Sequence, residues 1–498
     1  MRRLLPALLF LAAACDHTQP PNPLLDAGVS NQSDLSSGPS GDVDLSTVEP
    51  APDLSTDDLS TLQPPKLDLA TGVDASPPGC VYDETSNGTA KLLGIYTMPS
   101  TSLTVMNPYL TPQQLADGLT NGAATTDAPG PGSGLEYGGG CPGTFYMVGD
   151  RGPNLDRTDG TKSFPIPAYT PAILKVHLSG TQLLADSTLP FMNKNSVPVT
   201  GLPNLPTDEV AYVSAASMTA LADNQDGLDP EDVRRLPSGD FAISEEYSPS
   251  VAIVDHTSGR IKVRYTPAGV TLPMAQYDVK PILPAVLTNR RLNKGLEGLA
   301  LTPDGKTAYA VLQTPMGDDK AYDNSLVNRI VRIDHFDDPA TAVTGAEYLV
   351  LHRDLTAFPG TAKQTKIFYN SATWLSPDHL LLLERGDGKL KLVVVDLTSA
   401  SNILGVTGEN TLGPEAKSPG YQALGMVPAP TTEVFDSDDT PTFIKSPPDG
   451  AVVPDKLEGL AIINRTTVAI TNDNDFAVTN AADRTRIWIL RLKAPLPN

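Results

Sequence analysis

Short apolar runs, bounded by Gly, Pro, Asp or Asn, recur along the chain from about residue 140 to its end. They are rich in Val and Ile, which is typical of β-strands. Thr111–Leu119 is the best match to an amphipathic helix. The pattern therefore predicts an all-β fold with strands at Thr144–Val148, Ala172–Leu178, Asp240–Ser244, Val251–Asp255, Arg260–Tyr265, Thr307–Leu312, Arg329–Ile333, His379–Leu383, Lys389–Asp396, Thr467–Thr471 and Arg486–Leu492.

A sequence repeat groups these strands into units. The pentapeptide Leu-Glu-Gly-Leu-Ala occurs at 296–300 and again at 457–461, and Gly227–Glu231 is a weaker relative. A tight turn and a strand follow each copy, so each unit reads as strand, turn, strand. β-Propellers are built from such repeated small sheets around a channel, with blades of roughly 40–50 residues. We expect a single propeller of six or seven blades with loop insertions over residues 81–498, and a pair of β-sandwiches remains the alternative.

The first fifteen residues have the pattern of an export signal. Arg2 and Arg3 precede the apolar run Leu4–Ala14, which is too short to span a bilayer as a mature helix. The run ends at Cys15 in a sequence that resembles a bacterial lipobox. We expect residues 1–15 to be a lipoprotein signal peptide and Cys15 to carry the lipid, so that the protein is exported and membrane-anchored. Ordinary signal-peptidase cleavage is the alternative, and inner or outer membrane stays open.

Residues 16–80 have the composition of a disordered linker. They contain no aromatic residue, ten Pro, and eleven acidic residues against the single base Lys66, and Asp-Leu-Ser recurs four times. Such a segment buries too little apolar surface to offset its ordering entropy. We expect an extended, self-repelling tether, with a recognition repeat for a partner as the alternative.

Two cysteines follow the tether. Because an exported protein meets an oxidising compartment, we expect a disulfide between Cys80 and Cys141. Two buried free thiols are the alternative.

The formal net charge of the chain is −22. This excess of acid argues against a nucleic-acid-binding protein, which needs basic surfaces. Ten of the excess negative charges lie in the tether. The acidic residues that recur at repeat positions carry more information than the total.

Three glutamates, Glu231, Glu297 and Glu458, occupy equivalent places in the repeat units. In a propeller these places lie at the channel mouth, where converging carboxylates repel one another unless a cation or a proton neutralises them. Carboxylate oxygens suit Ca²⁺ or Mg²⁺. Asp473 and Asp475, at the exit of a predicted strand, are further candidate ligands. The alternatives are turn-capping or pairing with neighbouring Lys or Arg residues, and a simple turn at 472–475.

Arginines stand beside acids at two strand ends, in Asp150-Arg151 and Glu384-Arg385. An arginine binds phosphate or carboxylate in a bidentate manner, although structural ion pairs explain these sites equally well. The chain has no Gly-x-Ser-x-Gly elbow, no P-loop and no His-Glu-x-x-His motif.

Taken jointly, the motifs resemble the bacterial phytase-like family, described as esterase-like activity of phytase. The resemblance covers about residues 90–492. It differs at Glu245, where the family more often has Asp. It rests on Phe145–Gly152, Asp229–Glu231, Ser244–Ser250, Asn293–Ala300, Glu384-Arg385, Lys456–Ala461 and Asn472–Asp475.

The resemblance implies a secreted propeller that hydrolyses phosphate or other esters. As the first hypothesis, the five acids above hold Ca²⁺, Arg151 and Arg385 clamp a phosphate, and Glu246 acts as general base. We expect a monomer acting on a small ester, anchored to the membrane and without nucleic acid. The second hypothesis is a non-catalytic propeller that binds or scaffolds at the cell surface, and a metal-assisted lactonase or carboxylesterase is a third.

Overall fold

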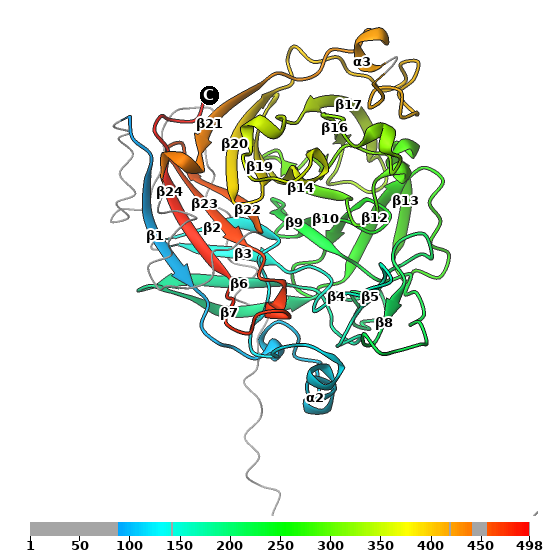
Figure 1. The fold of residues 1–498 in the computed structure, drawn as a ribbon, viewed down its shortest axis with the longest axis vertical. Helices are drawn as coiled ribbons and strands as arrows, with labels where there is room; N and C mark the ends of the chain where they lie inside the picture. The colour runs from blue at the N-terminus through cyan, green and yellow to red at the C-terminus, as the bar shows by residue number, and fades with distance from the viewer. Residues whose placement is uncertain (1–87, 141–142, 418–419, 441–455, 498) are drawn as a thin grey trace, which may run out of the picture. The chain divides into compact units, whose positions relative to one another are not determined.

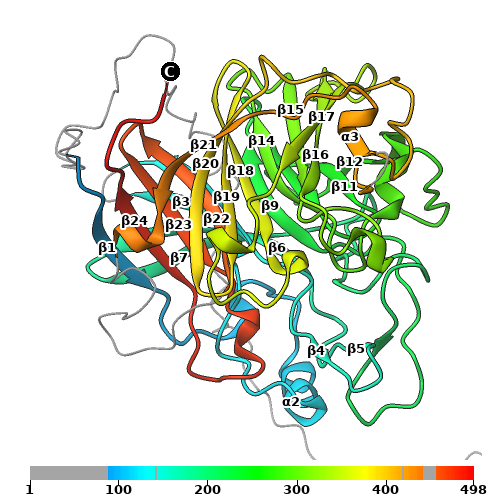
Figure 2. The ribbon, with the colours of Figure 1, turned by 45° about the horizontal axis from the view of Figure 1, so that its top comes forward.

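The computed structural model describes residues 88–140, 143–417, 420–440 and 456–497, all within the unit Ser55–Asn498. Most of its strands form five groups, which we call blades I to V and which run from an inner to an outer strand (Figures 1 and 2). Blade I is β2 (Gly134–Gly139), β3 (Thr144–Val148), β6 (Ala172–Ser179) and β7 (Gln182–Pro190); blade II is β9 (Pro230–Arg235), β10 (Phe241–Glu245), β11 (Ser250–Val254), β12 (Ile261–Pro267) and β13 (Asp278–Leu283); blade III is β14 (Leu296–Leu301), β15 (Thr307–Leu312), β16 (Val327–Asp334) and β17 (Val343–Leu351); blade IV is β18 (Phe368–Ser376), β19 (His379–Gly386), β20 (Lys389–Asp396) and β21 (Thr431–Asp436); blade V is β22 (Leu457–Asn464), β23 (Thr467–Asn472), β24 (Arg486–Arg491) and β1 (Lys91–Thr97).

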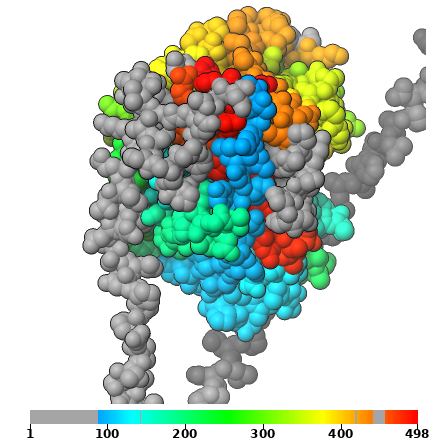
Figure 3. Space-filling view, turned by 90° about the vertical axis from the view of Figure 1, so that its left-hand side faces the viewer, coloured from blue at the N-terminus to red at the C-terminus, as the bar shows by residue number. Residues whose placement is uncertain are grey.

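The first strand of the described chain completes the last blade. Strand β1 pairs antiparallel with β24, from Lys91 opposite Arg491 to Thr97 opposite Arg486. Figure 3 shows the first described residues, in blue, beside those near the C-terminal end of the described chain, in red. A parallel bridge between Thr97 and Gln182 links blade V to blade I. Pairing of the two chain ends in one blade holds the ring of blades closed.

The inner strands confirm a propeller. Strand β2 contacts β9, β9 contacts β14, β14 contacts β18, β18 contacts β22, and β22 contacts β2, so the ring closes after five blades. The described residues thus form fewer blades than the six or seven that we expected. That number assumed compact repeats, whereas long stretches of chain here form connections, such as residues 191–229 and 397–430.

Hydrophobic side chains fill the space between every pair of neighbouring blades, in five clusters that follow one another around the ring. Strand β19 shows why its sequence is apolar at consecutive positions. Leu381 and Leu383 pack toward blade V, whereas Leu380 and Leu382 pack toward blade III. Because both faces of the strand are covered, alternation with polar residues is lost. Each such side chain stabilises the fold by about 1.5–3 kcal/mol.

An ion pair occupies the centre of the ring. Arg234 donates hydrogen bonds to Asp232 and to the backbone oxygens of Leu135, Ala372 and Leu460, which belong to β2, β18 and β22. Asp232 accepts from the backbone N–H of Leu299 in β14. Both side chains are buried. The pair from β9 therefore binds all four other inner strands.

Elements outside the blades cover one end of the propeller. A small sheet of β4 (Leu155–Asp156), β5 (Lys162–Ser163) and β8 (Ala211–Tyr212) belongs to insertions in and after blade I. Helix α2 (Pro112–Asn121) begins with a capping box at Thr111 and confirms the predicted helix. The remaining helices are α3 (Gly420–Ala423) and the 3₁₀ turns Leu103–Val105, Ala285–Asn289, Lys320–Tyr322, Leu355–Ala357, Gln364–Lys366, Ser437–Asp439 and Asp475–Ala477.

Candidate functional site

A polar pocket of about 490 Å³ lies where the inner strands begin. Nine of its lining side chains are carboxylates and six are cations, so its walls carry both signs of charge. All eight side chains that the sequence suggested for catalysis or metal binding line it: Arg151, Glu231, Glu246, Glu297, Arg385, Glu458, Asp473 and Asp475. Their roles remain predictions, but the structure brings them into one place.

The three repeat glutamates enter the pocket from equivalent positions. Glu231, Glu297 and Glu458 are the second residues of the inner strands β9, β14 and β22. Each is more than nine-tenths buried. Burial raises the pKa of each carboxyl, and the neighbouring carboxylates raise those of Glu231 and Glu297 further.

These glutamates differ in their partners. Among the described residues Glu231 has no hydrogen bond or ion pair, although it is only 7% exposed. Glu297 accepts a hydrogen bond from the Gln313 amide. Glu458 forms an ion pair with Arg385 at 2.8 Å. The chain therefore neutralises Glu458 itself and leaves the charges of Glu231 and Glu297 without a base in hydrogen-bonding contact.

Two groups of carboxylates are close enough to share a cation. One is Asp229, Glu231 and Glu246, and the other is Asp150, Asp473 and Asp475; within each group the oxygens lie within 4.8 Å of one another. The five predicted ligands are thus divided between separate groups, and Glu297 and Glu458 belong to neither.

Lys456 meets the second group. Its ammonium lies 3.3 Å from Asp473 and also contacts Asp475. The turn at Asp475–Ala477 has positive φ at all three residues, an unfavourable conformation for residues with a Cβ. Burial raises the pKa of Asp150 to about 6, although Arg151 and Lys456 oppose this effect. Lys456 is therefore the cationic partner of Asp473 and Asp475 within the chain.

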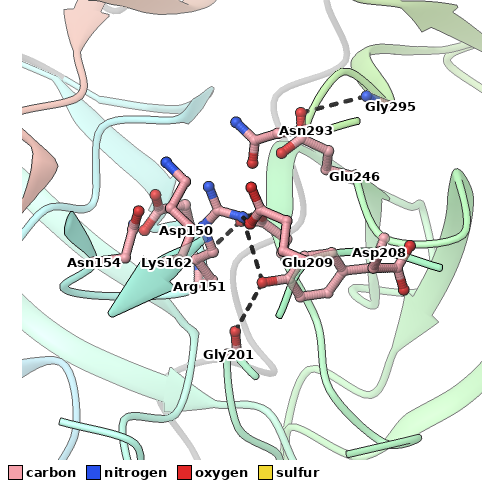
Figure 4. A network of polar contacts seen from close by, with 12 residues as sticks. Asp150, Arg151, Asn154, Lys162, Gly201, Asp208, Glu209, Glu246, Asn293 and Gly295 are labelled. Carbon is pink, nitrogen blue, oxygen red and sulfur yellow. Dashed lines mark hydrogen bonds and ion pairs between the residues drawn. The ribbon is translucent and has the colours of Figure 1, made fainter. Parts of the chain in front are cut away.

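Arg151 lines the pocket and is held there by acids, of which Figure 4 shows Glu209. Its guanidinium lies 2.5 Å from Glu209 and 3.1 Å from Asp229, and it donates to the Tyr247 hydroxyl. Glu209 belongs to the insertion after blade I, so sequence reasoning gave no signal for it. These contacts fit the structural ion pair that the sequence left as one alternative.

Glu246 lies beside a backbone amide. The N–H of Gly295 donates to its carboxylate at 3.3 Å, as Figure 4 shows. A Cβ at position 295 would stand 2.4 Å from the Glu246 backbone oxygen, so glycine permits this approach. Burial raises the pKa of Glu246, but Lys294 and Arg151 lower it more, and the result lies below the usual range. Glu246 is therefore ionised at neutral pH.

Two cations share one aromatic ring in the pocket wall. Lys294 and Arg385 approach the Phe368 ring at 5.2 and 4.9 Å from its centroid. Burial lowers the pKa of Lys294, as do the nearby charges of Lys456 and Arg385, against the effects of Glu246 and Glu297. The sequence predicts neighbouring lysines only as partners of the acids, and the places of Lys294 and Lys456 next to the Leu-Glu-Gly-Leu-Ala motifs were the signal for them. Gln313 was missed because it follows an ordinary apolar strand.

Other sequence candidates have structural partners or lie outside the described residues. Glu384 binds His352 and Arg353, and Glu245 binds Arg264 in the core. Cys15, Cys80 and Cys141 fall outside the described residues, so the lipid anchor and the disulfide stay predictions. No described helix has the length and apolarity needed to cross a membrane.

The fold and the pocket define a β-propeller protein whose channel mouth is lined by acids and bases. The chain belongs to the phytase-like family, described as esterase-like activity of phytase, whose model matches residues 130–476. This membership confirms the resemblance found in the motifs and places the chain in an esterase-like propeller family.

No curated protein matches the chain. Solved structures with similar folds include a GH43 β-1,3-galactosidase, at 9% identity over 74% of this chain and 94% of that one, with a TM-score of 0.35. A luciferin-regenerating enzyme is 9% identical over 74% and 94%, with a TM-score of 0.30. The calcium-binding protein regucalcin from Agrobacterium tumefaciens is 12% identical over 74% and 96%, with a TM-score of 0.28. At these TM-scores the similarities support no conclusion about this chain's chemistry.

Proposed function

We propose that the pocket is the active site of a metal-assisted hydrolase of phosphate esters. The observation that carries the proposal is Glu231, a buried carboxylate without a partner among the described residues, which lines the pocket beside Glu297. Ionisation of a buried carboxyl without a partner is costly, which is why the pKa of Glu231 is raised, and a bound cation removes that cost.

The donor set fits a hard divalent cation such as Ca²⁺. Glu231, Glu246 and Asp229 offer carboxylate oxygens within 4.8 Å of one another, and Glu297 lies next to Glu231. When bound, the cation supplies positive charge beside the substrate oxygens and makes a neighbouring water more acidic. Glu458, Asp473 and Asp475 have bases as partners, and Asp229 has Arg151. The proposal centres on the first group because that group contains Glu231, which has no partner among the described residues.

Cations of the opposite wall would bind the phosphate. Arg385 and Lys294 are held against Phe368, and Asp473 and Asp475 hold Lys456. Because these side chains are already held in place, little side-chain conformational entropy is lost when they bind an anion. Arg151, held by Glu209 and Asp229, would position Asp229 rather than clamp the phosphate.

Two carboxyl groups suit proton transfer. Glu246 is ionised, as a general base must be before it accepts a proton. The pKa of Asp150, about 6, lets this group exchange a proton near neutral pH. The two groups enter from different loops of the pocket, so one can act on the attacking water and the other on the leaving group.

A non-catalytic propeller was the alternative, and it predicted acids dispersed around the rim. The convergence of the candidate side chains in one pocket supports the hydrolase instead.

The test is an assay of the purified chain with phytate, p-nitrophenyl phosphate and p-nitrophenyl acetate, with Ca²⁺ and with a chelator. We expect phosphate release that needs the cation and that falls about 100-fold in Glu231→Gln. Glu433→Gln is the control, since this exposed acid on β21 pairs with Lys391 outside the pocket. Absence of phosphate release from both phosphate esters with Ca²⁺ present would contradict the proposal.

The proposal includes export and anchoring through Cys15. Cells fed a labelled fatty acid should yield a labelled protein, and Cys15→Ser should remove the label. An unlabelled parent protein would favour ordinary signal cleavage.

A further inference from the structure

A long connection of blade IV reaches over to blade III. Within the connection from β20 to β21, residues 397–417 and 420–430 are described, and these are called the arm here. In Figures 1 and 2 the arm, with α3, lies beside β17 and β16. Ile403 and Met426 of the arm pack against Val327 and Leu349 in a small apolar cluster of their own.

The arm supplies hydrogen bonds to the outer edge of β17. The backbone N–H of Ile403 donates to the backbone oxygen of Glu347 at 2.8 Å, and that of Ala429 donates to the backbone oxygen of Leu349 at 2.7 Å. The Glu347 N–H donates to the side chain of Asn402. An exposed strand edge is a template for pairing with another chain. The arm therefore protects the edge of blade III.

One arginine ties the arm to the blade. Arg329 of β16 is fully buried and donates to Glu347 of β17 at 2.7 Å and to Glu415 of the arm at 2.6 and 3.0 Å. It also donates to the backbone oxygens of Glu409 and Thr411 in the arm. All five of its N–H groups thus have acceptors.

The charges at this contact do not balance. Glu347 faces Arg329 on β16 and Glu409 of the arm, and Arg329 also binds Glu415 of the arm. One base thus meets three acids, all nearly excluded from water. Glu415 is paired through both oxygens. Glu347 and Glu409 each keep one buried oxygen, Oε2 and Oε1, without a partner. Two adjacent unpartnered carboxylate oxygens are stable only with a proton or a cation between them.

We propose that a proton shared between Glu347 and Glu409 closes the arm over β17, and that loss of this proton opens it. Neither Arg329 nor any residue of the arm lines the pocket. The proposal does not depend on the proposed hydrolase activity.

The acidity of Glu347 supports this device. Burial raises the pKa of Glu347 to about 7, and the Glu409 contact raises it too, against the effect of Arg329. A carboxyl whose pKa is higher in the closed state favours closure at low pH. That advantage falls as the pH rises from the usual value of 4.5 through about 7. With these values the opening constant increases about tenfold between pH 6 and pH 9.

Hydrogen exchange followed by mass spectrometry on the full chain tests the proposal. We expect the protection factors of arm peptides, corrected for intrinsic exchange, to fall about tenfold from pH 6 to pH 9, while those of β20 peptides stay constant. Glu347→Gln imitates the protonated acid, because its amide donates to Glu409 and its oxygen accepts from Arg329. This variant should keep the arm closed at pH 9, and Glu409→Gln should do the same from the arm side.

Glu415→Gln is the matched control. It weakens a contact of the same arginine but leaves the shared proton in place, so protection should be lower at both pH values with the tenfold dependence kept. Three results would overturn the proposal: parent protection that is independent of pH, a pH dependence retained in both Glu347→Gln and Glu409→Gln, or arm protection that changes with Ca²⁺ or chelator. The last result would replace the proton by a cation.

Discussion

The ion pair at the centre of the ring gives the sharpest test of how the five blades are held together. Replacing Arg234 by Met leaves Asp232 buried without its cation, and it removes the hydrogen bonds that Arg234 donates to the backbone oxygens of Leu135, Ala372 and Leu460. Removing one partner of a buried ion pair costs about 3–5 kcal/mol. Unpaired buried oxygens add to the cost, at about 1–3 kcal/mol each where the site does not relax. We expect Arg234→Met to lose at least about 4 kcal/mol of unfolding free energy.

Urea unfolding at pH 8 measures this loss, and the double variant with Asp232→Asn separates the pair from the backbone hydrogen bonds. Burial raises the pKa of Asp232 to about 6, although Arg234 lowers it. At pH 5, below this pKa, Asp232 is mostly protonated, so removal of Arg234 leaves less unpaired charge and the loss should be smaller than at pH 8. Arg234→Lys keeps the charge and serves if the Met variant does not fold. A loss of less than about 1 kcal/mol in Arg234→Met would refute the view that this pair ties the inner strands together.

Three further variants test the pocket and its surroundings. Gly295→Ala should displace Glu246 and cost about 1–3 kcal/mol of stability and most of the activity. Thermal unfolding and the esterase assay measure these losses, and unchanged activity would contradict the prediction. Glu209→Gln leaves Arg151 with Asp229 as its charged partner and should cost about 1–3 kcal/mol in urea unfolding, whereas no loss would show that the insertion does not brace Arg151. Burial raises the pKa of Glu136 to about 7, so this group should lower the stability of the parent by up to about 3 kcal/mol from pH 4.5 to 7. Glu136→Gln should flatten that decline, and parallel pH profiles of stability for the parent and the variant would contradict this.

The hydrophobic pattern located the strands of the blades well. All eleven predicted strands coincide with strands of the structure, and the repeat marked the inner strands β9, β14 and β22. The inner strands β2 and β18 were missed. Strand β2 contains Gly134, Gly138 and Gly139, and these glycines weaken the sequence pattern of a strand. Glycine is needed at position 134 because a Cβ there would stand 2.7 Å from the Cα of Asp232. Close packing of inner strands thus removes the residues by which a strand is recognised.

The number of blades depended on pairing between distant residues. Strand β1 joins β24 across almost the whole described chain, and no local pattern predicts that partner. The insertions after β7 and β20 add residues to the chain without adding strands to the ring. Division of the chain length by a usual repeat length therefore gave too many blades.

The sequence by itself determined that three glutamates would reach the pocket, because the repeat places Glu231, Glu297 and Glu458 at the same register of three inner strands. Only the tertiary structure decided which of them has a partner. Arg385 neutralises Glu458 from a distance of 73 residues along the chain, while Glu231 is left unpaired. Local residue patterns fix the direction of a side chain along its strand, whereas its charge balance depends on neighbours that the closed ring brings together.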